Sequence, residues 1–191
     1  MKKIILIITL IISLTCESQV IVNTNTFNLG NNSGKYFKDL DNNFQNFIGT
    51  WENTSGNKTF RVTLFKITKK PFGYPIDYYA DEIGGSFQII ENINTTNELV
   101  LNNSIKFYPL KNITSTSVIH SSPSNPIIAK GYIEDNCATG QIGWLTGYLS
   151  MTIMNSGSNP LIMHWIVEQK AIYTEGESYS VPKDILLTKM N

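Results

Sequence analysis

Residues 47–68 read FIGTWENTSGNKTFRVTLFKIT. From residue 49 onward, apolar and polar residues alternate with a period of two, which is typical of a β-strand with one buried face. Residues 54–57 are Thr, Ser, Gly and Asn, and this composition predicts a turn. In the strand that follows, residues 59–68, one face carries Phe60, Val62 and Leu64. The apolar series then moves to the opposite face at residue 65, which indicates a β-bulge or a strand covered on both sides.

The same short-period pattern continues through the rest of the chain. We expect further strands at residues 83–90, 98–102, 117–121, 127–135, 141–146, 148–154, 161–169 and 185–189. About eight to ten short strands with regularly spaced turns are typical of an antiparallel barrel or sandwich. Helices that could connect parallel strands are missing from the pattern. We therefore predict an all-β fold consisting of a single antiparallel β-barrel.

The pattern differs upstream of this region. Residues 19–35 are polar and rich in Asn, and we expect an extended arm there. Residues 36–47 have apolar side chains at spacings of three and four, which predicts a short helix with one apolar face, formed by Phe37, Leu40, Phe44 and Phe47. The chain is thus predicted to have three parts: a signal peptide at 1–18, the arm and short helix at 19–48, and the β-barrel domain at 49–191.

The first residues have the composition of a secretory signal peptide. Two lysines precede an apolar run at residues 4–14, which is too short to span a bilayer as a helix. Small residues fit cleavage after Ser18, so that Gln19 would begin a mature chain that is periplasmic or secreted. The alternative is a lipoprotein anchored at Cys16. No later segment is long and apolar enough for a transmembrane helix.

The composition argues against several kinds of partner and chemistry. Fifteen basic and fifteen acidic residues give a formal net charge of zero, so nucleic acid is not expected as a partner. If Cys16 leaves with the leader, Cys137 is the last thiol and no disulfide forms within the chain. Two isolated histidines, His120 and His164, do not make a zinc site. We expect no metal and no cofactor.

Candidate catalytic groups are sparse. Residues 77–82 include three carboxylates, which could bind Ca²⁺ as oxygen ligands. The spacing of a calcium loop is absent, and a solvated loop with two packing tyrosines is the favoured interpretation. No serine has the Gly-x-Ser-x-Gly context of a hydrolase nucleophile. We therefore name no catalytic residue and lean against an enzyme.

Three aromatic residues lie in or beside neighbouring predicted strands, namely Trp144, Tyr148 and Trp165. Aromatic side chains have large, flat, apolar faces, so these residues could line a ligand pocket. The alternative is ordinary packing in the core. They are our candidate ligand-binding residues.

The segment around Gly49 and Trp51 resembles the opening of lipocalin-like (calycin) proteins, in which a short helical turn runs into a Gly-x-Trp at the first strand. The resemblance implies that Gly49 permits a tight turn and that Trp51 closes one end of the barrel. It also implies a basic side chain stacked over the tryptophan, for which Lys183 or Lys189 is available. The later lipocalin motifs are not visible, so ligand binding does not transfer with the fold.

A second resemblance covers nearly the whole chain. Leu40 and Asp41, the Gly-x-Trp, a strand rich in Thr and aromatics, and the segment 81–85 (Asp-Glu-Ile-Gly-Gly) resemble a family of small secreted Gram-negative proteins, a domain-of-unknown-function family. That family implies no activity.

Three classes of function follow. A binding module would hold a small or apolar molecule inside the barrel, in a cavity lined by Trp and Tyr. An envelope interaction or structural protein would have a filled barrel and an exposed apolar patch or free edge strand. An enzyme would need clustered acids, or a histidine with a partner, in a cleft. We lean slightly to the first class, on the analogy of fold alone.

Overall fold

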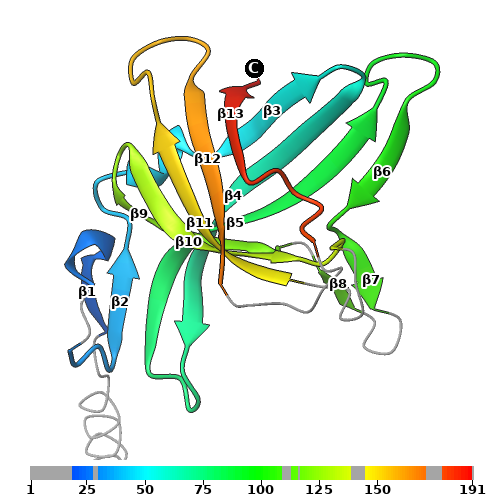
Figure 1. The fold of residues 1–191 in the computed structure, drawn as a ribbon. Helices are drawn as coiled ribbons and strands as arrows, with labels where there is room; N and C mark the ends of the chain where they lie inside the picture. The colour runs from blue at the N-terminus through cyan, green and yellow to red at the C-terminus, as the bar shows by residue number, and fades with distance from the viewer. Residues whose placement is uncertain are drawn as a thin grey trace, which may run out of the picture.

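The computed structural model describes residues 19–27, 30–108, 113–115, 117–138, 145–170 and 178–190. The described chain is all-β, and the predicted single antiparallel barrel is confirmed (Figure 1). Eight strands form it: β3 (Gly49–Ser55), β4 (Lys58–Phe72), β5 (Tyr78–Glu91), β9 (Ile119–Asn125), β10 (Ile128–Asp135), β11 (Leu145–Ile153), β12 (Ile162–Gln169) and β13 (Asp184–Lys189).

The barrel closes through a short contact between β5 and β9. Around the ring, the order is β5, β4, β3, β13, β12, β11, β10 and β9, and every neighbouring pair is antiparallel. The closing register places Ile83 opposite Ser121, Gly84 opposite His120, and Gly85 opposite Ile119. This closure brings the outer faces of β9 and β10 beside the first residues of β5.

One edge of β5 is shared by three strands, while β4 occupies the other edge. Before the closure, β2 (Lys35–Lys38) pairs in parallel with Tyr79 and Ala80 of β5. Beyond the closure, β6 (Leu99–Asn103) pairs with β5 as an antiparallel strand. β1 (Val20–Asn23) adds to β2 in parallel, and the two lie beside the lower end of the β4–β5 hairpin in Figure 1. A separate hairpin consists of β7 (Lys106–Tyr108) and β8 (Ile113–Ser115).

Large side chains fill the barrel interior. Alternate residues of the barrel strands point inward and join one hydrophobic cluster. Its largest fully buried members include Trp51, Trp165, Phe87, Leu64 and Leu149. The rings of Phe60 and Trp165 meet edge to face with centroids 5.7 Å apart, a favourable aromatic arrangement. The interior is therefore a packed core along the described strands.

The switch of faces predicted at residue 65 is not found there: Phe65 and Ile67 lie on the outer face in regular alternation, and a β-bulge follows further along β4. The register against β5 shifts between Ile67 and Lys70, and Lys69 has a φ of 53°. Side chains alternate along a strand, so an extra residue reverses the face that follows. As a result, Lys66 pairs opposite the inward-facing Ile83, whereas Lys70 pairs opposite Ala80, which faces outward.

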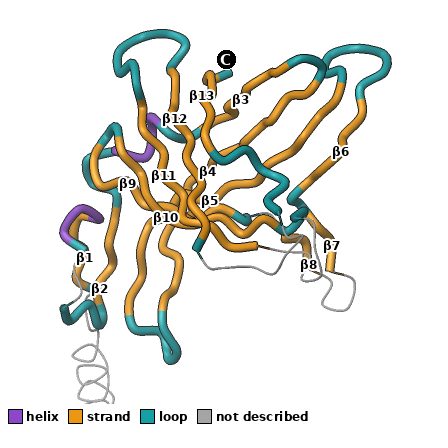
Figure 2. The backbone as a smooth tube through the Cα atoms, viewed as in Figure 1, coloured by secondary structure: helices purple, strands orange, loops and turns teal. Residues whose placement is uncertain are grey.

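The predicted helix at residues 36–47 is wrong. Its first residues form β2, and only Asn43–Asn46 make a short 3₁₀ turn, η2; a second one, η1 (Thr24–Thr26), follows β1 (Figure 2). Asn42 has a left-handed φ of 56°, which interrupts any helix before this turn. Phe37 lies on β2 and Phe44 lies in η2, and both side chains are buried. The apolar spacing that predicted one helix therefore comes from two separate elements.

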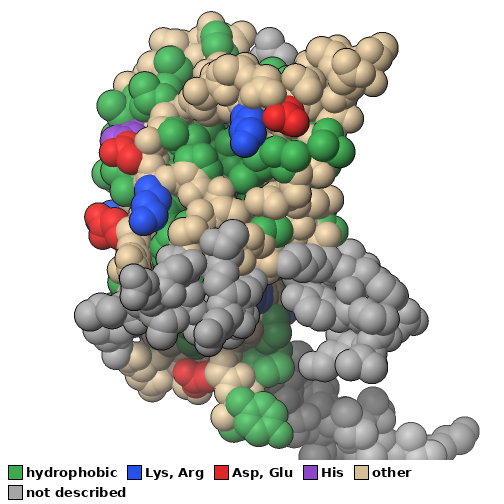
Figure 3. Space-filling view, turned by 45° about the vertical axis from the view of Figure 1, so that its right-hand side comes forward, with side chains coloured by type: hydrophobic (Ala, Val, Ile, Leu, Met, Phe, Trp, Pro, Cys, Tyr) green, Lys and Arg blue, Asp and Glu red, His purple; other side chains and the backbone are tan. Residues whose placement is uncertain are grey.

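The surface also exposes apolar side chains. On β6, Leu99, Val100 and Leu101 are exposed by 55%, 45% and 40%. On the face that Figure 3 turns toward the viewer, charged side chains are few and hydrophobic ones lie among uncharged polar groups. β6 pairs with no described strand other than β5, so its second edge is a free strand edge within the described chain.

Candidate functional site

The most distinctive hollow lies between the N-terminal arm and the outer face of the barrel. We call it the arm pocket. It has a volume of about 230 Å³ and is bounded by η1, β2, the end of the β4–β5 hairpin, β9 and β10. It lies outside because β2, β5, β9 and β10 turn their outward-facing residues toward it. The short β5–β9 closure explains how segments distant in sequence meet here.

One wall of the arm pocket is aromatic. The rings of Phe72 and Tyr78 are stacked with centroids 5.1 Å apart and planes 5° apart. Phe37 meets Tyr78 edge to face at 5.7 Å, and Phe27 from the arm meets Phe37 at 5.0 Å. Phe72 and Tyr78 are opposite each other across the β4–β5 ladder, which fixes their contact. These four rings present a broad apolar face.

The opposite wall is polar and centres on Glu82. Its Oε2 lies 2.6 Å from Lys70 Nζ and 3.2 Å from His120 Nδ1, and Lys70 Nζ lies 3.1 Å from the same histidine nitrogen. Burial raises the pKa of the Glu82 carboxyl, but hydrogen bonds and charges from His120 and Lys70 outweigh burial and lower it. Glu82 is therefore ionised, and Lys70 compensates its charge.

Two residues of β10 complete this wall. The ring of Tyr132 lies 5.0 Å from that of His120. Burial raises the pKa of the Tyr132 hydroxyl, and the carboxylates of Glu82 and Glu134 raise it further, so the phenol remains a donor. Lys130 also lines the pocket and makes no ion pair with any residue that the structure describes. The pocket therefore combines an apolar wall with several hydrogen-bond donors.

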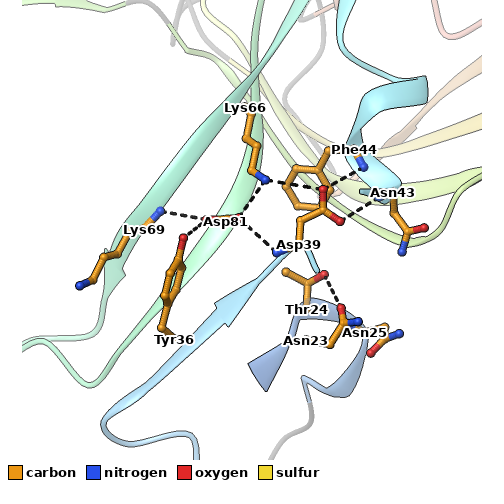
Figure 4. Close-up of polar contacts among 10 residues, drawn as sticks. All are labelled: Asn23, Thr24, Asn25, Tyr36, Asp39, Asn43, Phe44, Lys66, Lys69 and Asp81. Atoms are coloured by element: carbon orange, nitrogen blue, oxygen red, sulfur yellow. Dashed lines mark hydrogen bonds and ion pairs between the residues drawn. The ribbon is translucent and has the colours of Figure 1, made fainter. Parts of the chain in front are cut away.

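A buried network attaches the arm to the barrel on the other side of β5 (Figure 4). The Tyr36 hydroxyl donates to Asp81 Oδ1 at 2.6 Å, and the Asp39 amide donates to Asp81 Oδ2 at 3.1 Å. Lys66 Nζ lies 3.0 Å from Asp81 Oδ2 and 3.6 Å from Asp39 Oδ2. Asp39 in turn accepts the amides of Asn43 and Phe44. We call Tyr36, Asp39, Lys66 and Asp81 the carboxylate clamp.

The network changes the ionisation of its members. Burial raises the pKa of the Asp81 carboxyl, but hydrogen bonds from Tyr36, from the Lys69 and Asp39 amides and from Lys66 together lower it. Burial raises the pKa of the Tyr36 hydroxyl, and Asp81 raises it further, so the phenol stays protonated. The clamp is therefore a carboxylate held by complementary donors, and its role is structural.

Of the candidate ligand-binding aromatics, neither Tyr148 nor Trp165 lines the arm pocket. Trp144 lies outside the described residues. Tyr148 is 54% exposed on the outer face of β11, whereas Trp165 is fully buried inside the barrel. Tyr148 lines a second outer hollow of about 340 Å³ that shares Lys130 and Gly131 with the arm pocket.

Gly49, Trp51 and Lys189 lie close together, where β13 pairs with β3. Gly49 has a φ of 127°, and a Cβ there would lie 3.1 Å from Lys189 Cε. Trp51 is fully buried, and its Nε1 donates to the Phe47 carbonyl at 2.7 Å. Lys189 Nζ lies 5.5 Å from the centre of the Trp51 ring and donates to the carbonyls of Gln45 and Asn46. Of the two lysines considered, Lys183 lies over Tyr179 instead.

Two further candidates do not line the arm pocket, namely His164 and Cys137. His164 Nε2 lies 2.6 Å from Asp184 Oδ1 on the exposed side of β12 and β13. Cys137 is half-buried, and its Sγ lies 3.5 Å from the Asn103 carbonyl oxygen. Within the described ranges, no group of three or more His, Cys, Asp or Glu side chains is arranged to hold a metal ion. In the same ranges, no helix has the length and apolarity required to cross a membrane.

Sequence reasoning missed the arm pocket because it assigned residues 77–82 to a solvated loop. They include the start of β5, where Asp81 and Glu82 are both buried. Adjacent residues on a strand point to opposite faces, so each carboxylate meets its own lysine, Lys66 inside and Lys70 outside. One sequence signal could have indicated this arrangement. Asp81 and Glu82 are adjacent acids within a strand, and the strand that forms a hairpin with it carries two lysines four residues apart, Lys66 and Lys70.

The fold and the site define a closed, eight-stranded antiparallel barrel that has a packed core and an amphipathic pocket on its outer face. The chain belongs to a family of unknown function, DUF6705, whose model matches residues 1–190. Searches of curated proteins and of solved structures return no match for this chain.

Proposed function

We propose that the protein is a binding module that holds a small, largely apolar molecule in the arm pocket. The single observation that carries this proposal is the four-ring aromatic wall facing the donors of β9 and β10 across a pocket of about 230 Å³. Small-molecule sites typically combine an apolar lining with a few polar groups. Because side chains fill the barrel interior, the ligand is placed on the outer face and not within the barrel.

The test uses a neutral apolar fluorophore, N-phenyl-1-naphthylamine, and a pocket-filling substitution. Ser122 and Ser124 both face outward on β9, but only Ser122 lines the pocket. Ser122→Phe should abolish the fluorescence increase on probe binding, whereas Ser124→Phe should leave it unchanged. Equal binding by both variants and the parent would refute a site in the arm pocket.

Native mass spectrometry would identify the natural ligand. Protein purified from its own source should carry extra mass that disappears on denaturation, and Ser122→Phe should lack it. Extra mass retained by Ser122→Phe would place the ligand elsewhere, with the hollow beside Tyr148 as the next site to test.

We further propose that the protein is exported in a Gram-negative cell and is periplasmic or secreted. The lysine pair, the apolar run at residues 4–14 and the small residues before Gln19 support this proposal. The intact mass of protein isolated from its own cells distinguishes the outcomes. A chain that begins at Gln19 supports cleavage after Ser18, whereas a chain that begins at an acylated Cys16 supports a lipoprotein.

We propose a lipocalin-like construction for the barrel. Lys189 over the Trp51 ring, together with Gly49 at the entry to β3, supports it. An experimental structure that aligns β3 and β13 with the first and last strands of a lipocalin would test this assignment.

A second candidate function is protein–protein interaction through β6, and the exposed side chains of Leu99, Val100 and Leu101 favour it. A partner strand could pair with the free edge of β6. Leu101→Lys should then abolish a complex detected by cross-linking in the envelope, and Ser122→Phe should not.

A further inference from the structure

We infer that the ligand of the arm pocket carries one anionic group of the carboxylate class, which pairs with Lys130 while its apolar body lies against the aromatic wall. This inference rests on the proposed function and specifies the chemistry of the molecule that the pocket takes. It follows from the charge balance of the pocket and from the neighbours of Lys130.

The acids that line the arm pocket already have cationic partners. Asp81 lies 3.0 Å from Lys66 Nζ on the inner side of β5, and Glu82 lies 2.6 Å from Lys70 Nζ on the outer side. Both carboxyl groups have lowered pKa values and are ionised. The Glu82–Lys70 pair therefore contributes no net charge to the pocket. Asp81 shares Lys66 with Asp39, which does not line the pocket.

Lys130 is the lining residue whose charge has no such partner among the described residues. Its cross-strand neighbours are Ser122 on β9 and Ser150 on β11, so no acid faces it across either ladder. Glu134 lies on the same strand but does not line the arm pocket, and Glu168 lines the adjoining hollow without an ion pair to Lys130. Lys130 is also exposed, so its ammonium group is accessible to an anion that binds in the pocket.

The groups around Lys130 can also donate hydrogen bonds to an anion. Ser122 contributes a hydroxyl to the pocket lining, and Tyr132 contributes a phenol that its raised pKa keeps protonated. Donors clustered around one ammonium group favour an acceptor-only group such as a carboxylate. A volume of about 230 Å³ lies below the range of roughly 300–1,000 Å³ typical of drug-sized ligands. The ligand is therefore small, with one apolar body and one charged end.

Three naphthalene probes with different end groups test the inference: 2-naphthoate, 2-naphthalenemethanol and 2-naphthylmethylamine. Titration calorimetry should show that the carboxylate binds roughly five- to tenfold more tightly than the alcohol, because a hydrogen bond to a charged group contributes more than a neutral one. The amine should bind most weakly. Lys130→Met should reduce the affinity for the carboxylate to that for the alcohol and leave the affinity for the alcohol unchanged.

Lys58→Met is the matched control, because Lys58 is an exposed lysine of β4 that does not line the pocket. It should retain the full preference for the carboxylate. If the neutral fluorophore binds but the three probes bind equally, or if Lys130→Met keeps the preference, the anionic-ligand inference is overturned while the arm pocket stands. If Ser122→Phe leaves fluorophore binding unchanged, the proposed function itself fails.

Discussion

Among the described glycines, Gly131 is the one at which an added Cβ would come closest to a neighbouring backbone. A Cβ on Gly131 would lie 2.0 Å from the His120 carbonyl oxygen and 2.6 Å from Ser121 Cα. Both atoms belong to the β9 backbone, which cannot yield without disturbing the β9–β10 ladder. We expect Gly131→Ala to lower the free energy of unfolding by at least about 2 kcal/mol, as overpacking does. Urea denaturation measures this loss, and Lys130→Ala, one residue earlier, should change stability by less than about 0.5 kcal/mol.

At Ser121, in contrast to Gly131, we expect a substitution by alanine not to destabilise the protein. Its Oγ is buried and has no hydrogen-bond partner among the described residues, and the side chain faces the core beside Ile83. A buried polar group without a partner costs free energy, so its removal relieves that cost. Ser121→Ala should therefore leave the midpoint of urea denaturation unchanged or raise it. A clear destabilisation would show that the hydroxyl has a partner in the folded protein.

Among the elements, β5 contributes most to the site; its strand over residues 83–90 was predicted, whereas its first residues were assigned to a loop. Alternation along residues 59–68 correctly predicted β4 and the inward-facing residues Phe60, Val62 and Leu64, but it put the switch of faces at residue 65, whereas the bulge lies between Ile67 and Lys70. The parallel pairing of β2 with β5 could not be predicted, because it joins residues more than forty positions apart and leaves no local pattern. Of the predicted apolar face, Phe37, Phe44 and Phe47 are buried, but Leu40 is 56% exposed. Separate elements, and not one helix, contribute the three buried rings.

The carboxylate clamp makes the attachment of β2 sensitive to acid. The folded pKa of Asp81 lies below its ordinary value of 3.8, so its contribution to stability is complete above that value and is lost as the pH falls through the folded pKa. Asp81→Asn should destabilise the protein at neutral pH by roughly 2 kcal/mol or more, because Lys66 and Tyr36 lose their anionic partner. Below about pH 3.8, its stability should fall less steeply than that of the parent.

Urea midpoints measured at several pH values check both expectations. Asp184→Asn serves as the control, because Asp184 is exposed and pairs only with His164 among the described residues. Loss of this exposed ion pair should change the urea midpoint little at neutral pH, in contrast to Asp81→Asn. Identical slopes for Asp81→Asn and the parent would mean that Asp81 titrates alike in the folded and unfolded chains.

In the whole molecule, the barrel contains the hydrophobic core, whereas the N-terminal arm contributes to the lining of the arm pocket. The hydrophobic core cluster begins at Phe44, and none of residues 19–27 belongs to it. β1 pairs only with β2 among the described strands, whereas Thr24 and Phe27 line the arm pocket. Stability should therefore depend mainly on the barrel, and ligand binding on the arm.

A chain that begins at Gly30 tests this division against one that begins at Gln19. The shorter chain should keep a single cooperative unfolding transition, because every residue of the core cluster is retained. It should lose binding of N-phenyl-1-naphthylamine, because Phe27 leaves the aromatic wall and Thr24 leaves the pocket lining. Calorimetry and fluorescence titration on the same samples separate the two effects. A shorter chain that binds the probe as the longer one does would move the site away from the arm, and one that unfolds without cooperativity would make the arm part of the folding unit.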